Sequence, residues 1–120
     1  MNVSEMITQV KNHSDFDKAG MLLCHNGVVR RTSRDGREVS GLKIVVDHRK
    51  LEQVIAEYKK TPGIIEIVCE IDENKDLAVG DDVMVLIVAG DIRDTVITVL
   101  KDALNAIKTT VTTKTEYFIG

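Results

Sequence analysis

Aromatic residues are scarce in this chain, which has no tryptophan, two tyrosines and two phenylalanines among its 120 residues. A ligand with a flat ring would therefore not be held on a platform of stacked aromatic side chains. Proline is equally rare, and the only one, Pro62, precedes Gly63, a pair that predicts the end of a helix. Because the sequence shows no repeat, low-complexity segment or linker, we expect a single domain covering residues 1–120.

The chain has only two cysteines, Cys24 and Cys69, and each lies in an apolar run of strand length. Cysteine is among the residues most often buried, so the pattern favours two buried, reduced thiols over a disulfide. Neither cysteine is accompanied by a CxxC or a His-x-His spacing. The sequence therefore predicts no metal site.

A surplus of basic residues and a long apolar run are also missing. The net charge is −3, which argues against a general affinity for nucleic acid, because neutralising phosphates requires an excess of positive charge. No apolar run approaches the roughly 20 residues that span a bilayer, and the N-terminus lacks the apolar core and cleavage site of a signal peptide. We therefore expect a cytoplasmic protein with no nucleic-acid or membrane partner.

Apolar residues recur at helical spacing in three stretches of the sequence. The longest begins at Asp91, which we expect to be the N-cap. Its apolar stripe consists of Ile92, Val96, Val99, Leu100, Ala103 and Ile107. A second helix is expected to follow the cap Asp47, and its buried face would carry Leu51, Val54, Ile55 and Tyr58. Residues 3–12 predict a shorter helix.

Stretches typical of strands separate these helices, at residues 19–25, 28–31, 41–47, 64–71, 83–89 and 111–119. Residues 83–89 are almost wholly apolar, as in a central strand covered on both faces. In residues 64–71, Ile65, Ile67, Cys69 and Ile71 would share one face, with Ile64 on the other. Asn26-Gly27 predicts a turn or bulge, and Asp35-Gly36 a type I′ hairpin turn. The order of elements predicts an α+β (mixed α/β) fold in which helices pack on a sheet.

No nucleophile elbow, phosphate-binding loop or dinucleotide motif is present, so the candidate site residues are isolated cations and a histidine. Arg30 follows a glycine turn at a strand end. Arg93 lies in the first turn of a helix, where free N–H groups and the helix dipole favour an anion that a guanidinium can pair with. Lys108 and Lys114 are candidate proton donors, acceptors or nucleophiles. For each of these four, a solvated surface charge is the alternative.

His25 is the histidine most consistent with a site, because it ends a strand beside a turn, where side chains often face a pocket. Arg93 and Lys108 are fifteen residues apart, which on a straight helix is about 22 Å. One small ligand therefore cannot contact both in one monomer unless the helix bends or a second subunit supplies one of them.

Four features, in this order and spacing, resemble the large, catalytic subunit of molybdopterin synthase. They are Gly27-Val28-Val29-Arg30 after an apolar strand, Leu77-x-x-Gly80-Asp81 before another, Arg93 in the first turn of a long helix, and Lys108 at its end followed by Lys114 and Glu116. The resemblance covers residues 19 to 117 and implies an α/β hammerhead fold with an added α+β layer.

The resemblance implies a sulfurtransferase of molybdenum cofactor biosynthesis. Such an enzyme uses a thiocarboxylate at the Gly-Gly C-terminus of a small ubiquitin-like subunit to convert cyclic pyranopterin monophosphate into molybdopterin, without a cofactor of its own. The large subunit forms a homodimer with one small subunit at each outer end, and both large subunits contribute to the pocket. By this resemblance Arg30, Arg93 and His25 would bind the substrate, and Lys108 and Lys114 would be the catalytic acid/base residues.

The chain departs from the family pattern at several positions. Ile92 stands where a histidine usually precedes the helix arginine, and His25 replaces an aromatic residue. Cys69-Glu70 replaces a His-Arg pair, and Thr112-Thr113 replaces a proline and aromatic residues in a segment one residue shorter, which leaves the alignment of Lys114 open by one position. A non-catalytic homologue acting as a dimeric protein-binding module is therefore the alternative. A sulfur carrier is disfavoured because the chain ends in Ile119-Gly120, not in Gly-Gly.

Overall fold

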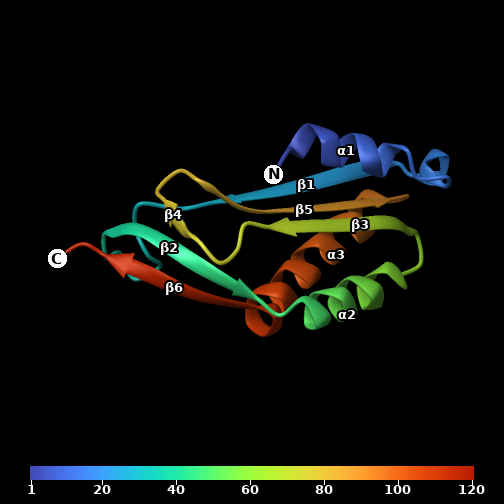
Figure 1. Ribbon diagram of the computed structural model, residues 1–120. Helices are drawn as coiled ribbons and strands as arrows, with labels where there is room; N and C mark the ends of the chain where they lie inside the picture. The colour runs from blue at the N-terminus through green and yellow to red at the C-terminus, as the bar shows by residue number, and fades with distance from the viewer.

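The computed structural model describes residues 1–120 (Figure 1). Its elements are α1 (Val3–Lys11), η1 (a 3₁₀ turn, Phe16–Lys18), β1 (Met21–Val28), β2 (Val39–Val46), α2 (His48–Lys59), β3 (Ile64–Ile71), β4 (Asp76–Ala78), β5 (Asp82–Gly90), α3 (Arg93–Ala106), η2 (a π-helix, Ile107–Val111) and β6 (Thr112–Phe118). The strands form two antiparallel sheets, where one sheet was expected: a larger one ordered β1–β5–β3 and a smaller one ordered β4–β2–β6. The α+β class is confirmed.

The larger sheet is covered on both faces, with α1 on one side and α2 and α3 on the other (Figure 1). Its central strand β5 has five consecutive residues, 85 to 89, with no exposed surface. Val85, Ile87 and Ala89 face α1, while Leu86 and Val88 face α3. The expectation of a central strand buried on both faces is therefore confirmed.

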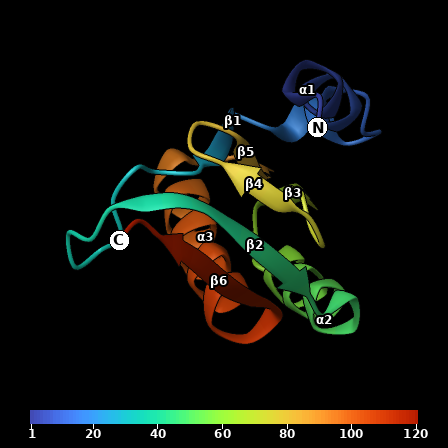
Figure 2. The same cartoon turned by 60° about the vertical axis from the view of Figure 1, so that its left-hand side comes forward.

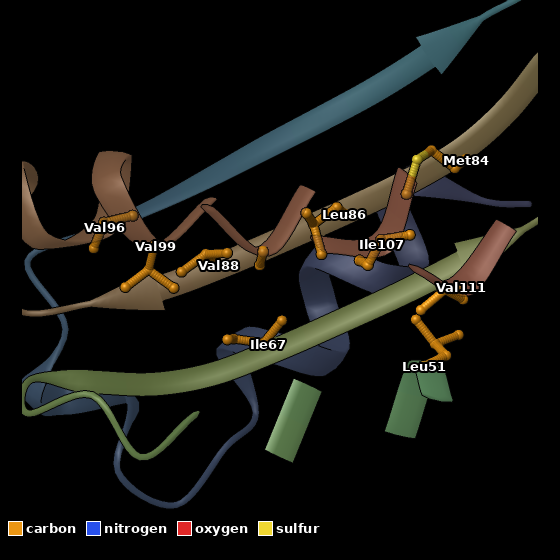
Figure 3. Close-up of a cluster of buried hydrophobic side chains, with 10 residues drawn as sticks. Leu51, Ile67, Met84, Leu86, Val88, Val96, Val99, Ile107 and Val111 are labelled. Atoms are coloured by element: carbon orange, nitrogen blue, oxygen red, sulfur yellow. The ribbon is translucent and has the colours of Figure 1, made fainter. Parts of the chain in front are cut away.

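The apolar stripe of α3 packs against this sheet (Figure 3). Its buried members are Val96, Val99, Ala103 and Ile107. Each buried Val or Ile side chain contributes on the order of 1.5–3 kcal/mol before chain entropy is subtracted. Figure 3 shows Val96 and Val99 beside Val88, while Ile107 lies beside Leu86 and Met84. The stripe therefore fixes the direction of α3 along β5.

The start of α3 differs from the prediction. Ile92, not Asp91, occupies the N-cap position, and no side chain caps the helix. Asp91 instead continues the chain from β5 and donates its backbone N–H to the carbonyl of Gly63 at 2.9 Å. Ile92 was assigned to the buried stripe but is 59% exposed, because it precedes the helix and does not share its periodicity.

Val29, directly after β1, packs against residues of both sheets. Figure 2 shows the smaller sheet in front of the larger one. The N–H of Val29 donates to the carbonyl of Asp81 at 2.9 Å, and its side chain is buried with Leu42, Ile44 and Leu77. The smaller sheet extends beyond the larger one, so the molecule is elongated, 51 × 26 × 24 Å (Figure 1). No helix is both long and apolar enough to cross a membrane.

Two turn predictions need correction. Asn26-Gly27 lies inside β1, because Asn26 pairs with Val85 and its side-chain amide donates to the Asp82 carboxylate at 3.2 Å. The alternative of a bulge is confirmed, since the register shifts between Gly27 and Val28. A turn does occur at Asp35-Gly36, but only Gly36 has a positive φ, of 86°, whereas type I′ requires two such residues.

A bulge also changes β3, whose predicted bounds are otherwise confirmed. The register against β5 shifts between Ile64 and Glu66. Ile64 therefore packs in the core beneath α3 with Ile67, although strict alternation would put these two residues on opposite faces.

Candidate active site

His25 and Lys108 lie together at the C-terminal end of α3. His25 pairs with Leu86 across β1 and β5, and paired residues of an antiparallel sheet share a face, so both side chains lie on the face that α3 covers. Lys108 follows Ile107, which packs beside Leu86 and Met84 at the same end of the sheet (Figure 3). Lys108 is close enough that its charge lowers the pKa of His25. These two predicted site residues are therefore brought together.

The imidazole of His25 is held neutral. Burial lowers its pKa from the ordinary value of 6.5, and the positive charge of Lys108 lowers it further. Both effects act in the same direction, because burial disfavours any charge on the ring and Lys108 repels a positive one. The Nε2 atom is buried, and no group of the protein hydrogen-bonds to it.

Gly27 lies directly beside this nitrogen. It lies two residues after His25 on the same face of β1. A Cβ at Gly27 would be 3.2 Å from Nε2 of His25 and 3.4 Å from Cγ of Met84. Sequence reasoning identified Gly27 only as part of a motif, and its role next to His25 depends on a strand that continues past it.

Lys108 lies within the π-helix η2, which widens the end of α3 before the chain enters β6. Threonine hydroxyls bond back to the preceding turn here: Thr109 Oγ1 donates to the Asn105 carbonyl at 2.9 Å, and Thr110 Oγ1 donates to that of Ala106 at 2.6 Å. Such back-bonding distorts helices, and single π turns often occur at functional sites. The run of threonines was the available signal in the sequence, but a π-helix was not predicted.

Lys114 lies on β6 opposite Ile44 of β2, and therefore on the same face as that buried residue. This face of the smaller sheet looks toward Ile71 and Val83 at the near end of the larger sheet. The Lys114 side chain is 53% exposed and pairs with the Glu116 carboxylate at 3.7 Å. Lys114 thus follows Lys108 on the next element, with a carboxylate as its neighbour.

Arg30 lies at the same end of the larger sheet as Gly27, two residues past the end of β1. Its side chain is exposed, and its Nε donates to the carbonyl of Thr32 at 2.7 Å. That contact uses one of the five guanidinium N–H groups, so four others are available for an anion. The buried neighbour Val29 fixes the backbone from which Arg30 projects.

Arg93 lies at the opposite end of the larger sheet. It is the first residue of α3, just after Gly90, which pairs with Met21 at the start of β1. From Met21 to Gly27 a strand covers about 20 Å. A single chain therefore does not bring Arg93 to His25 and Lys108, and this agrees with the separation calculated from the sequence.

The residues that replace the family's His-Arg pair do not both face the candidate site. Glu70 pairs with Val85 and therefore lies on the α1 side of the larger sheet, away from His25. Cys69 lies on the α3 side within the core, where burial, aided by the charge of Glu70, raises its pKa to about 12. A thiol with so high a pKa is not a nucleophile near neutral pH. Cys24 faces α1, and both thiols are free.

Comparisons with known proteins agree with this architecture. The family model described as MoaE protein matches residues 1–110. Molybdopterin synthase from Staphylococcus aureus superposes with a TM-score of 0.80 at 20% identity, covering 99% of this chain and 86% of that one. The MoaE protein from Burkholderia ambifaria MC40-6 gives a TM-score of 0.77 at 17% identity, covering 99% and 82%. No curated protein sequence matches the chain.

A further similar structure is that of a protein complex. A structure described as a complex of subunits 1 and 2 of molybdopterin-converting factor, from Helicobacter pylori 26695, contains a chain with a TM-score of 0.72 at 13% identity, covering 98% of this chain and 84% of that one. At these identities the solved structures establish the fold, while the family model extends over most of the sequence. The resemblance inferred from the four motifs is confirmed, and the chain belongs to the MoaE family.

Proposed function

We propose that this chain is the catalytic subunit of a molybdopterin synthase, acting in molybdenum cofactor biosynthesis. It transfers sulfur from the C-terminal thiocarboxylate of a small ubiquitin-like subunit to cyclic pyranopterin monophosphate. The main support, within a chain of the MoaE family, is the proximity of Lys108 to the neutral His25 at the end of α3. The fold places both side chains at the same end of the larger sheet.

The reaction requires a proton donor and acceptor beside the acyl carbon. When sulfur leaves a thiocarboxylate, the acyl carbon must take an oxygen from water to become a carboxylate. Water therefore loses a proton, and the negative charge that develops on the acyl oxygen needs a cation. Lys108, as an ammonium, supplies that cation, and Lys114 on the adjacent strand is the acid/base group that takes the proton from water.

Arg30 binds the phosphate or another anionic group of the pterin at the same end of the sheet. Arg93 completes the site from a second copy of the chain, since it lies about 20 Å away within its own chain. A homodimer with a small Gly-Gly-terminated subunit at each end supplies all these groups. The Helicobacter pylori relative is described as a two-subunit complex, which supports a small partner for this chain as well.

The proposed function is tested by reconstitution. The purified chain is mixed with a thiocarboxylated Gly-Gly carrier and cyclic pyranopterin monophosphate, and molybdopterin is measured after oxidation to a fluorescent derivative. We expect product in proportion to the thiocarboxylate consumed. A Staphylococcus aureus synthase that is active with the same carrier serves as the positive control. Absence of product from this chain alone would contradict the proposal.

One observation favours the alternative of a non-catalytic, dimeric binding module. The Lys114 ammonium pairs with Glu116, and half of its side chain is exposed, which are properties of a solvated surface charge. A binding module would retain nanomolar or micromolar affinity for the carrier without turnover. Calorimetric titration of the carrier alongside the product assay therefore separates the two functions.

A further inference from the structure

We propose that Nε2 of His25 binds the acyl end of the carrier's Gly-Gly tail, sharing this terminal carboxylate or thiocarboxylate with Lys108. The inference rests on the proposed function and specifies how the tail is held.

The first support is the unpartnered nitrogen itself. Nε2 of His25 is buried, yet no protein group donates to it or accepts from it. Buried polar atoms nearly always have a partner, so an exception next to a candidate catalytic lysine indicates an atom that meets a ligand. By contrast, the ring of His13 accepts a hydrogen bond from the N–H of Asp15, and the ring of His48 contacts Glu73.

The second support is the close approach of Gly27 to the nitrogen. Gly27 has no side chain where a Cβ would be 3.2 Å from Nε2. The backbone of Gly27 has no positive φ, so the glycine is not needed for its conformation. A side chain at position 27 would crowd Nε2, so a ligand that reaches this nitrogen past Gly27 has to be slender, as a chain that ends in two glycines is.

The third support is charge. Lys108 is close enough to lower the pKa of His25, and the N–H of a neutral imidazole is a donor, so a cation and a donor lie near each other. A carboxylate or thiocarboxylate has two acceptor atoms and one negative charge. The residues around His25 on β1 and β5 are Leu23, Gly27, Met84 and Leu86, none of which is charged. Lys108 is therefore the charged group that an acyl anion meets there.

Binding of an anion at Nε2 should be accompanied by proton uptake. In the free protein the pKa of His25 lies below 6.5. An anion bound at Nε2 favours the protonated ring and raises that pKa, so binding takes up protons at pH values around the two pKa values, that of the free and that of the bound protein. A ring that only fills space would produce no such uptake.

The test uses nuclear magnetic resonance of histidine-labelled protein and a short peptide ending in Gly-Gly with a free carboxylate. His25 is assigned by the signal lost in His25→Gln, and His13 and His48 are internal references. We expect the carboxylate peptide to shift the His25 signals and raise its pKa, while the C-terminally amidated peptide leaves both unchanged. Equal shifts with the amidated peptide, or none with either peptide, would overturn the proposal. A response to inorganic phosphate but not to the peptide would overturn it too, by assigning His25 to the pterin phosphate.

Variants extend the test to affinity. His25→Phe keeps a ring without nitrogen, and Gly27→Ala puts a methyl group against Nε2. Each should weaken carrier binding at least tenfold and abolish proton uptake measured by calorimetry in two buffers, whereas His25→Gln should restore part of the affinity. Unchanged affinity in His25→Phe, with unfolding temperature preserved, contradicts the proposal.

Failure of the His25 contact can be told apart from failure of the proposed synthase activity. If the chain makes no molybdopterin but the carboxylate peptide still titrates His25, the function fails and the tail contact stands. If the chain makes molybdopterin and His25→Phe is fully active with unchanged affinity, the function stands and the contact fails.

Discussion

Lys108 of η2 lies close enough to His25 of β1 that its ammonium charge lowers the pKa of the buried imidazole. Two segments far apart in the sequence meet here because β1 pairs with β5 and α3 packs along β5. The lowered pKa of His25 is therefore a consequence of the fold, and it can be tested.

Lys108→Ala should lower the rate of molybdopterin formation by about 10²–10⁴-fold, the usual contribution of a general acid or base. Its free energy of unfolding should change by less than about 0.5 kcal/mol, because Lys108 is exposed. Lys101→Ala, an exposed lysine on α3, is the matched control and should keep the rate of the unaltered chain. Rate measurements and denaturant titration of both variants check the prediction. A Lys108→Ala protein that is unfolded would show a structural role instead.

The buried imidazole should make stability depend on pH. The pKa of His25 is lowered in the folded chain, so between that value and the unfolded value near 6.5 the unfolded chain binds more protons. The stabilisation is complete above about pH 6.5 and is lost as pH falls through the lower, folded pKa. Denaturant unfolding of the native chain and of His25→Gln from pH 5 to 8 measures this. If the difference between them is the same at every pH, the shift is absent.

Glycine substitutions test how closely β2 and β4 approach. A methyl at Gly41 would overlap the carbonyl oxygen of Leu77, a backbone atom that cannot move aside without breaking the strand pair. Gly41→Ala should lower the free energy of unfolding by roughly 3 kcal/mol. Gly36→Ala, which meets no atom within 4 Å but keeps a φ of 86°, should lose only about 1–2 kcal/mol from backbone strain. Equal losses would mean that the approach at Gly41 is looser than described.

Local patterns predicted most of the elements. Asp47 caps α2 as expected, with its carboxylate accepting from the N–H of Lys50 at 3.1 Å, and the bounds of β3 agree with the prediction. The wrong assignments occur where tertiary pairing overrides local preference. Asn26 continues a strand because Asp82 and Met84 of β5 accept from its amide. The short strand β4 was missed because three residues carry no periodic signal.

The candidate site was predictable only as separate residues. The sequence identified His25 and Lys108 individually, but their proximity depends on which face of β1 the helix covers. The close approach of Gly27 to Nε2 depends on Gly27 remaining in the strand, contrary to the predicted turn. The distance between Arg93 and Lys108, in contrast, follows from helix geometry alone and was anticipated.

Mixing two inactive variants tests most directly whether the cationic site is assembled across a twofold contact. Lys108→Ala and Arg93→Ala dimers are each expected to be inactive, and after subunit exchange half of the dimers contain one chain of each kind. Each mixed dimer then has one site with both an intact Lys108 and an intact Arg93, so molybdopterin formation should recover to about a quarter of the rate of the unaltered chain. No recovery, when native mass spectrometry shows mixed dimers, would contradict a site shared between two chains.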